Sequence, residues 1–240
     1  ILENRIYDDE KFGIKELNKV NGIIQFRDVT FAYPDEEKLL DNFNLSIFPN
    51  KKVAIVGSSG SGKSTLFNLL TRIFDPLEGE ITIDGVNIQD LTEESLRKHI
   101  SIIRQEPFVF NRSIKDNFKI INNKITISEI RKYTKTAYLD DYIMSLPKKY
   151  DTVLGEGDVN LSGGQKQRIS IARAFIKDAP IMMMDDSVSA VDFKTEEEII
   201  SNIKEFRKGK TTIVIASRVS TVKTFDKIIV LKDGELEAFD

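Results

Sequence analysis

Gly57-Ser58-Ser59-Gly60-Ser61-Gly62-Lys63-Ser64-Thr65 is the stretch of this sequence that decides the fold. It follows the apolar, β-branched run Lys52–Val56 and precedes the mostly apolar residues Leu66–Leu70, which predicts a strand, a tight glycine-rich turn and a helix. The stretch fits the phosphate-binding loop (P-loop) pattern G-x-x-x-x-G-K-S/T. Its glycines allow successive backbone N–H groups to point at one phosphate, and the N-terminus of the helix adds partial positive charge.

Two side chains of the P-loop carry the remaining chemistry. Lys63 supplies a point charge for the β- and γ-phosphates of a nucleotide, and Ser64 offers a hydroxyl to Mg²⁺. The alternative interpretation is a glycine- and serine-rich loop that merely precedes a helix. The strand before the loop, the helix after it and the Lys-Ser pair in register favour the binding of a nucleoside triphosphate.

The composition of the chain excludes several classes of protein. Its 240 residues are 40% hydrophobic and 30% charged, as in an ordinary globular protein of one large or two small domains. A net charge of −3 gives no reason to expect a nucleic-acid partner. The chain has no cysteine and a single histidine, His99, which excludes disulfides, thiolate metal sites and histidine-cluster metal sites.

The beginning of the chain has the character of a connecting segment. Ile1 is not an initiator methionine, and residues 1–22 are charged and weakly patterned with no signal peptide. No apolar run approaches the roughly 18 residues that span a bilayer. We therefore expect a piece of a longer protein, in which residues 1–22 are a linker and residues 23–240 form the domain.

Two kinds of strand are predicted. Alternating patterns at residues 24–29, 43–47 and 80–83 indicate half-exposed antiparallel strands near the N-terminus. Runs that are apolar at nearly every position, at residues 180–184, 211–215 and 227–231, are typical of strands buried on both faces of a parallel sheet. The methionines Met182–Met184 could form a soft metal site, but a core strand that ends in carboxylates fits the pattern better.

The middle of the chain is predicted to be helical from about residue 107 to residue 177. Ser128 is a plausible N-cap for a helix that starts at Glu129, and the turn residues 75–79 are expected to end the P-loop helix. The predicted fold is therefore α/β, with a parallel-sheet core, an N-terminal antiparallel β subdomain and an inserted α-helical subdomain.

A second motif, Leu161-Ser162-Gly163-Gly164-Gln165, stands directly before the helical pattern of residues 166–174, and Ser162 can cap that helix. Placed between a P-loop and a strand that ends in Asp185, the motif resembles the signature of ATP-binding-cassette (ABC) transporter nucleotide-binding domains. The resemblance covers nearly the whole chain, roughly from Ile23 onward. It implies the ABC ATPase fold, ATP and Mg²⁺ as ligands, and ATP hydrolysis as the activity.

Further positions match the motifs of this family. Tyr33 resembles the aromatic residue that stacks on adenine, although a core tyrosine beside a turn is the alternative. Gln105 resembles the Q-loop glutamine, which reaches Mg²⁺ and the attacking water and couples the domain to a transmembrane domain. Asp185 matches the Walker B aspartate, so Ser64, Gln105 and Asp185 are the implied metal ligands. The implied ATP-binding residues are Tyr33, Gly57, Ser58, Ser59, Gly60, Ser61, Gly62, Lys63, Ser64 and Thr65.

Other matched segments indicate the subtype. Residues 75–85 and 105–110 look like the exporter branch of the family, in which each cassette follows a six-helix membrane domain. The loop Gly155-Glu156-Gly157-Asp158 resembles the segment before the signature in exporters, with Asp158 in place of the usual glycine. The implied D-loop residues are Ser189, Ala190, Val191 and Asp192. The resemblance places the domain at the cytoplasmic face of a membrane, with a transmembrane domain and a second ATP-binding domain as partners.

Two positions depart from the family pattern, and both concern hydrolysis. Asp186 stands where the family usually has the glutamate that polarises the attacking water, and Ser217 stands at the place of the switch histidine. His99 precedes the Q-loop strand and is interpreted as a surface or packing residue. The intact P-loop and signature imply that the domain binds ATP, hydrolyses it slowly, and lends residues 161–165 to the ATP of a partner, as in the degenerate half of a heterodimeric exporter.

Two other functions stay open. A homodimer with Asp186 and Ser217 in both sites would be a nucleotide-dependent dimerisation or regulatory module with negligible turnover. A soluble ABC protein without a membrane partner is disfavoured by the exporter-like spacing and by the linker-like first residues. The transported substrate is chosen by segments that this chain does not contain.

Overall fold

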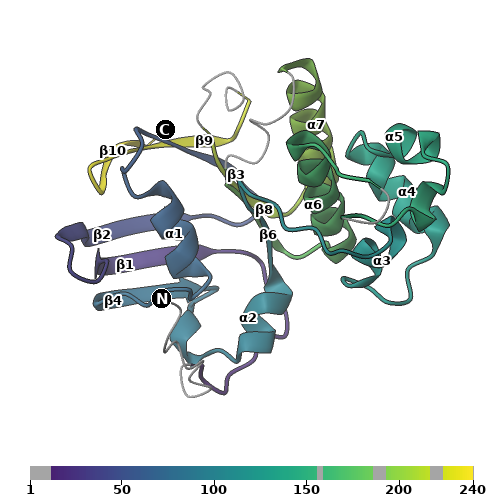
Figure 1. Ribbon diagram of the computed structural model, residues 1–240. Helices are drawn as coiled ribbons and strands as arrows, with labels where there is room; N and C mark the ends of the chain where they lie inside the picture. The colour runs from purple at the N-terminus through teal and green to yellow at the C-terminus, as the bar shows by residue number, and fades with distance from the viewer. Residues whose placement is uncertain (1–11, 156–158, 186–192, 217–223, 240) are drawn as a thin grey trace.

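The computed structural model describes residues 12–155, 159–185, 193–216 and 224–239. The described residues form two β-sheets and a set of helices, and α3, α4 and α5 gather on the side of the molecule away from β1, β2 and β4 (Figure 1). The fold class predicted from the sequence is confirmed, with an antiparallel β subdomain beside a mostly parallel sheet.

The antiparallel sheet contains the alternating segments predicted near the N-terminus. In spatial order, its four strands are β2 (Lys38–Ile47), β1 (Ile24–Ala32), β4 (Glu78–Ile83) and β5 (Val86–Asn87). All of its pairings are antiparallel. Strand β1 is longer than predicted, because the register shifts after Phe26 and pairing with β2 continues to Ala32.

The second sheet carries the P-loop strand at its centre. In spatial order, its six strands are β10 (Glu235–Phe239), β9 (Lys227–Lys232), β3 (Lys52–Val56), β8 (Thr211–Ile215), β7 (Ile181–Asp185) and β6 (Ile100–Ile103). Strands β9, β3, β8, β7 and β6 are parallel, and β10 pairs antiparallel with β9.

The central strands separate two hydrophobic clusters, as their unbroken apolar runs predict. Met183 packs with β1, β2, β4 and α1 in one cluster, and Met182 and Met184 pack with the helices in the other. All three methionine side chains are fully buried, so they belong to the core. Successive side chains of this strand therefore pack on opposite faces of the sheet.

The helices lie mainly between β6 and β7 in the chain. They are α1 (Lys63–Leu70), η2 (Ile88–Asp90), α2 (Glu93–His99), α3 (Ile114–Lys119), α4 (Ile127–Thr136), α5 (Asp140–Ser145), η3 (Lys149–Asp151), α6 (Gly163–Lys177) and α7 (Phe193–Phe206). Among the described residues, no helix combines the length and the apolar character needed to cross a membrane.

Two predicted helix ends are wrong. Helix α4 is capped by Thr126 rather than Ser128, because Thr126 and Glu129 hold each other's backbone N–H groups in a capping box. Helix α1 ends at Leu70, before the turn residues 75–79, because Arg72 adopts a left-handed backbone conformation with φ of 55°. Because α1 ends early, the Arg72 side chain turns toward η2, where it donates to the Gln89 carbonyl oxygen.

Candidate nucleotide-binding site

The P-loop connects the end of β3 to the start of α1 and needs glycine at two points. A Cβ atom on Gly57 would lie 2.1 Å from the carbonyl oxygen of Leu231 on the neighbouring strand β9. Gly62, the N-cap of α1, has a φ of 98°, which a residue with a side chain rarely adopts. Close packing against β9 and the left-handed N-cap together direct the loop into the helix.

Lys63 lies over the P-loop as its first helical residue. Its ammonium group donates hydrogen bonds to the carbonyl oxygens of Gly57, at 2.8 Å, and Ser58. It also donates to the Ser61 hydroxyl at 3.4 Å. The ammonium is therefore held at the centre of the loop, where a phosphate cradled by the loop would lie.

Ser64 and Asp185 bring together the two oxygen groups expected of a magnesium site. The Ser64 hydroxyl donates to the Asp185 carboxylate at 3.3 Å, from the first turn of α1 to the end of β7. Gln105, which follows β6, lines the same cleft. Hydroxyl, carboxylate and amide oxygens are the hard ligands that Mg²⁺ prefers, so the donor set fits this metal ion.

A cleft of about 530 Å³ collects the predicted nucleotide-binding residues. A volume of this size is typical of small-molecule sites. Its lining includes Tyr33, Gly57, Ser59, Gly60, Gly62, Lys63, Ser64, Thr65, Gln105 and Asp185. Segments far apart in the sequence therefore converge on one site, as parallel strands do at their carboxyl ends.

Tyr33 is fixed at this cleft by contacts on its edges. Its hydroxyl forms a hydrogen bond of 2.9 Å with the Thr65 hydroxyl of α1. Its ring packs edge-to-face with Phe31 and Phe74, at centroid distances of 5.0 Å and 5.3 Å. The tyrosine is thus both a packing residue and a wall of the cleft.

Three further lining residues have no motif in the sequence: Glu36, Leu39 and Ile215. Ile215 is the last residue of β8, next to the P-loop strand, so the rule that ligands bind at the carboxyl ends of parallel strands could have found it. Glu36 lies in the turn between β1 and β2, and Leu39 lies near the start of β2; no residue pattern indicates that either lines the cleft.

The signature residues form the exposed start of α6. The Ser162 hydroxyl accepts from the Gln165 N–H at 3.3 Å, while the Gln165 side chain accepts from the Ser162 N–H at 2.8 Å. Leu161 is buried and anchors this helix start, whereas Ser162 and Gly163 are exposed. Within the described chain, residues 161–165 do not line the P-loop cleft.

The His99 side chain packs in the interior of the domain, which is one of the two roles predicted for it from the sequence. Its side chain is 6% exposed, and Nδ1 lies 2.7 Å from the Ser95 carbonyl oxygen within α2. Several predicted site residues lie outside the described residues: Asp186, Ser217, the D-loop residues Ser189, Ala190, Val191 and Asp192, and the segment 156–158.

Comparison with known proteins identifies relatives that share the sequence of this domain. The family model for ABC transporters matches residues 40–189. The β-(1→2)glucan export ATP-binding/permease protein NdvA of Rhizobium etli is 41% identical over 98% of this chain and 40% of its own length. The ATP-dependent lipid A-core flippase of Desulfotalea psychrophila is 45% identical over 89% of this chain and 37% of its own length.

A solved structure shows the same fold. The bacterial Atm1-family ABC exporter with ATP bound superposes with a TM-score of 0.87 at 36% sequence identity. The match covers 95% of this chain and 41% of that chain. This chain therefore spans less than half the length of the relatives compared.

A P-loop, a Walker B aspartate and a signature helix start on an α/β core define an ATP-binding cassette, and the chain belongs to the ABC transporter family. More narrowly, it is an ATP-binding domain of exporter type, the kind that binds ATP with Mg²⁺.

Proposed function

We propose that this domain is the ATPase of a longer membrane exporter and lies at the cytoplasmic face of the membrane. The observation that carries the proposal is the convergence of Lys63, Ser64, Gln105 and Asp185 on one cleft. The relatives' names support it, because NdvA is called an ATP-binding/permease protein and the second relative a flippase. Their cargoes differ, and the substrate of this chain's transporter is left open.

Each group at the cleft has a role toward MgATP. The P-loop N–H groups and Lys63 would hold the β- and γ-phosphates, and Tyr33 would stack on the adenine. Ser64, Asp185 and Gln105 would hold Mg²⁺, which neutralises charge on the phosphates when it is bound. Gln105 would also orient the water that attacks the γ-phosphate.

We further propose that this domain's own site turns over slowly. Asp186 provides a carboxylate on a stem one methylene shorter than the glutamate usual in the family, and Ser217 lacks the positive charge that a histidine can carry. General-base assistance is worth about 10²- to 10⁴-fold and depends on hydrogen-bond reach. The alternative function, a regulatory dimerisation module, would follow if turnover were negligible.

The exposed signature supports a partner domain. Because Ser162 and Gly163 face solvent and stay outside this chain's own cleft, they are free to complete the site of a second ATP-binding domain. We propose a heterodimer in which the partner carries the glutamate and the histidine. A homodimer is the second possibility.

A separate face suits the transmembrane domain. Phe108 is 68% exposed beside the Q-loop, and Ile120 and Ile121 are exposed at the end of α3. Next to them, a groove of about 260 Å³ is lined by Arg97, Arg173 and Lys177 among others. Burial lowers the pKa of Lys177, and the charge of Arg97 lowers it further. An apolar helix end that carries a carboxylate fits this face, since it would fill the groove and compensate the cations.

The test of the proposed function uses the full-length transporter in lipid vesicles. We expect Lys63→Ala to reduce ATP turnover at this site by about 100-fold or more, because the phosphates lose the positive charge of the lysine that binds them. Lys232→Ala, on an exposed lysine outside the cleft, is the matched control. Turnover at this site that Lys63→Ala leaves unchanged, measured with the partner's site inactivated, would overturn the proposal, and nucleotide-dependent dimerisation without any turnover would favour the regulatory module.

A further inference from the structure

The segment that precedes β1 is bound to the domain along its length. We call residues 12–23 the strap. The strap's backbone pairs with the region around η2: Gly13 N–H donates to Leu91 O at 3.0 Å, Lys15 N–H to Asp90 O at 2.8 Å, and Thr92 N–H to Lys15 O at 2.9 Å. These three bonds fix the register of the first half of the strap on the domain.

The middle and the C-terminal end of the strap are fixed as well. Leu17 is buried in the core and its N–H donates to the Ser95 hydroxyl at 2.9 Å. At the start of β1, the Asp84 carboxylate accepts from the N–H groups of Asn21, Gly22 and Ile23 at 2.6, 3.3 and 2.8 Å. A Cβ atom on Gly13 would lie 2.1 Å from Asp90 O, which explains the glycine at this close approach.

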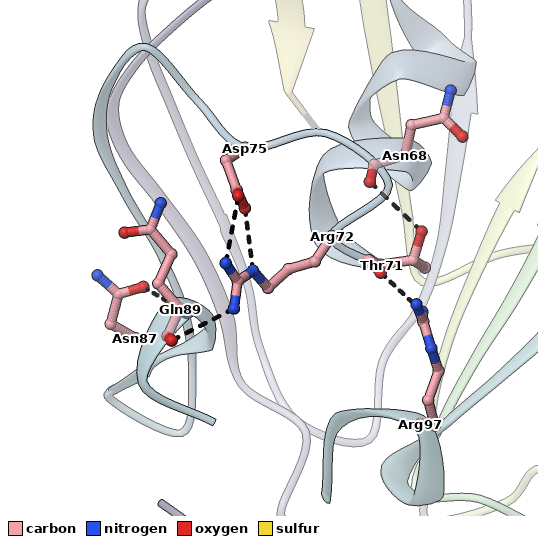
Figure 2. Close-up of polar contacts among 7 residues, drawn as sticks. All are labelled: Asn68, Thr71, Arg72, Asp75, Asn87, Gln89 and Arg97. Carbon is pink, nitrogen blue, oxygen red and sulfur yellow. Dashed lines mark hydrogen bonds and ion pairs between the residues drawn. The ribbon is translucent and has the colours of Figure 1, made fainter. Parts of the chain in front are cut away.

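Arg72 lies where the P-loop helix meets this region (Figure 2). Its side chain is 3% exposed, and its Nε and Nη2 atoms donate to both oxygens of Asp75 at 2.9 and 3.2 Å. Its Nη1 atom donates to the Gln89 carbonyl oxygen of η2 at 3.3 Å. The guanidinium is therefore held in one orientation by groups from two segments.

A second arginine ties the same helix end to α2. Arg97 Nη1 donates to the Thr71 carbonyl oxygen at 2.7 Å, and the Thr71 hydroxyl donates back to Phe67 O at 2.8 Å (Figure 2 shows the Arg97 contact). The carbonyl oxygen of Thr71, the C-cap residue of α1, is thus satisfied by an arginine of α2, the helix that also binds the strap through Ser95.

Phe12 provides the contact between the strap and the end of α1. Its ring lies under the Arg72 guanidinium, whose central carbon is 4.6 Å from the ring centroid. An arginine above an aromatic ring at this distance is attracted by the ring's negative face. A lysine could not replace Arg72, since it lacks the flat fork that binds Asp75, Gln89 and the ring together.

We infer that Arg72 is a positioning residue that joins the P-loop helix to the strap. Helix α1 starts at Lys63, in the nucleotide cleft, and its other end is held by Arg72 against Phe12. Because rigid secondary-structure elements carry energetic coupling between sites, any displacement of the P-loop on nucleotide binding would reach the strap through this contact. The strap then transmits it to whatever precedes residue 12. This connection rests on the proposed function; it does not involve Gln105, and it shares Arg97 with the groove lined by Arg97, Arg173 and Lys177.

The experiment compares Phe12→Leu with Phe12→Tyr in the full-length transporter. Leucine keeps an apolar side chain but removes the ring face, and tyrosine keeps that face. We expect Phe12→Leu to leave the KM for MgATP within about twofold and to lower the substrate transported per ATP by about fivefold. Tyrosine should restore the wild-type ratio. A wild-type ratio in Phe12→Leu would overturn the inference.

A spectroscopic measurement tests the connection without relying on turnover. Spin labels are placed at Ile14→Cys, where the native side chain is 93% exposed on the strap, and at Asn68→Cys on α1. We expect one narrow distance distribution with and without MgATP, and a broad one after Phe12→Leu. A distribution that stays narrow in Phe12→Leu would overturn the inference. Failure of the proposed function would be seen separately, as ATP turnover at this site that does not depend on Lys63.

Discussion

The Ser64 hydroxyl and the Asp185 carboxylate meet at 3.3 Å although 121 positions separate them in the chain. The contact exists because β3 and β7 flank β8 in a parallel sheet, so their carboxyl ends, and the residues that follow, lie at one edge. The P-loop brings the phosphates to this edge, and the pair brings the oxygen ligands for the metal ion that accompanies them.

Replacement of Asp185 by asparagine should weaken Mg²⁺ binding. The amide keeps the shape of the side chain but removes the charge, so we expect the Mg²⁺ concentration for half-maximal ATP turnover to rise at least about tenfold. Asp233→Asn is the control, because Asp233 is an exposed residue with a φ of 47° that asparagine tolerates. An unchanged Mg²⁺ titration in Asp185→Asn would contradict the assignment of this ligand.

A substitution at the start of α6, Gly163→Asp, should reduce turnover at the partner's site. A Cβ atom on Gly163 meets nothing within 4 Å, and an acidic residue is favourable in the first turn of a helix, so Gly163→Asp should fold normally. Its carboxylate would repel the phosphates of a nucleotide that the signature faces. In the dimeric transporter we expect turnover at the partner's site to fall at least about tenfold. Gly163→Ala is the steric control and should lose far less; equal turnover in Gly163→Asp and Gly163→Ala would count against the shared site.

The helical region contains a buried carboxylate whose ionisation supports the fold. Asp140 is 2% exposed; it accepts from Arg131 Nε and Nη2 at 3.1 and 3.0 Å and from the Tyr150 hydroxyl at 2.7 Å. Burial alone would raise the pKa of Asp140, but the hydrogen bonds from Arg131 and Tyr150 outweigh burial and hold this pKa below its ordinary value. The carboxylate therefore stabilises α4, α5 and η3 against one another in its charged form.

The sign of the pH dependence follows from this lowered pKa. A carboxyl with a lower pKa in the folded state contributes stability above its unfolded-state pKa of about 4, and this is lost as the pH falls through the folded-state value. We expect Asp140→Asn to lower the free energy of unfolding at pH 7 by about 2 kcal/mol and to flatten its fall below about pH 4. Thermal melts from pH 3 to pH 8 measure both effects. Asp141→Asn, on the exposed neighbour, should change neither.

We expect that lysine cannot replace Arg207 without a loss of stability. Its side chain is fully buried and donates to the carbonyl oxygens of Ala179, Pro180 and Thr211 at 2.6, 2.9 and 3.0 Å. Burial lowers the pKa of Arg207 to about 10, so the group stays charged at neutral pH. Lysine lacks the planar fork that reaches these acceptors, so we expect Arg207→Lys to destabilise the domain by about 3 kcal/mol. Denaturant titration should show this loss, whereas Lys208→Arg on the exposed neighbour should be neutral.

What the sequence predicts well here depends on local chemistry. The P-loop and the signature are recognised because their glycine, lysine and serine residues have roles within a few positions. The wrong end of α1 shows the limit, since the left-handed conformation of Arg72 depends on Asp75 and Gln89, and the latter belongs to another element. The strap is a stronger case: its partners lie more than 60 positions away, and no residue pattern between 12 and 23 reveals them.

The two departures from the family pattern lead to the last prediction. If Asp186 and Ser217 limit hydrolysis at this domain's own site, Asp186→Glu combined with Ser217→His should raise turnover there, by up to about 100-fold if general-base reach is the limit. Single-turnover measurements on the transporter, with the partner's site inactivated, isolate this site. The single substitutions, Asp186→Glu and Ser217→His, show whether the general base or the residue at the switch-histidine position limits the rate of hydrolysis more. The effects should be strongly non-additive, because both groups act on the same attacking water and γ-phosphate. A double variant no faster than the wild type would show that the slow step lies elsewhere, for example in opening of the dimer.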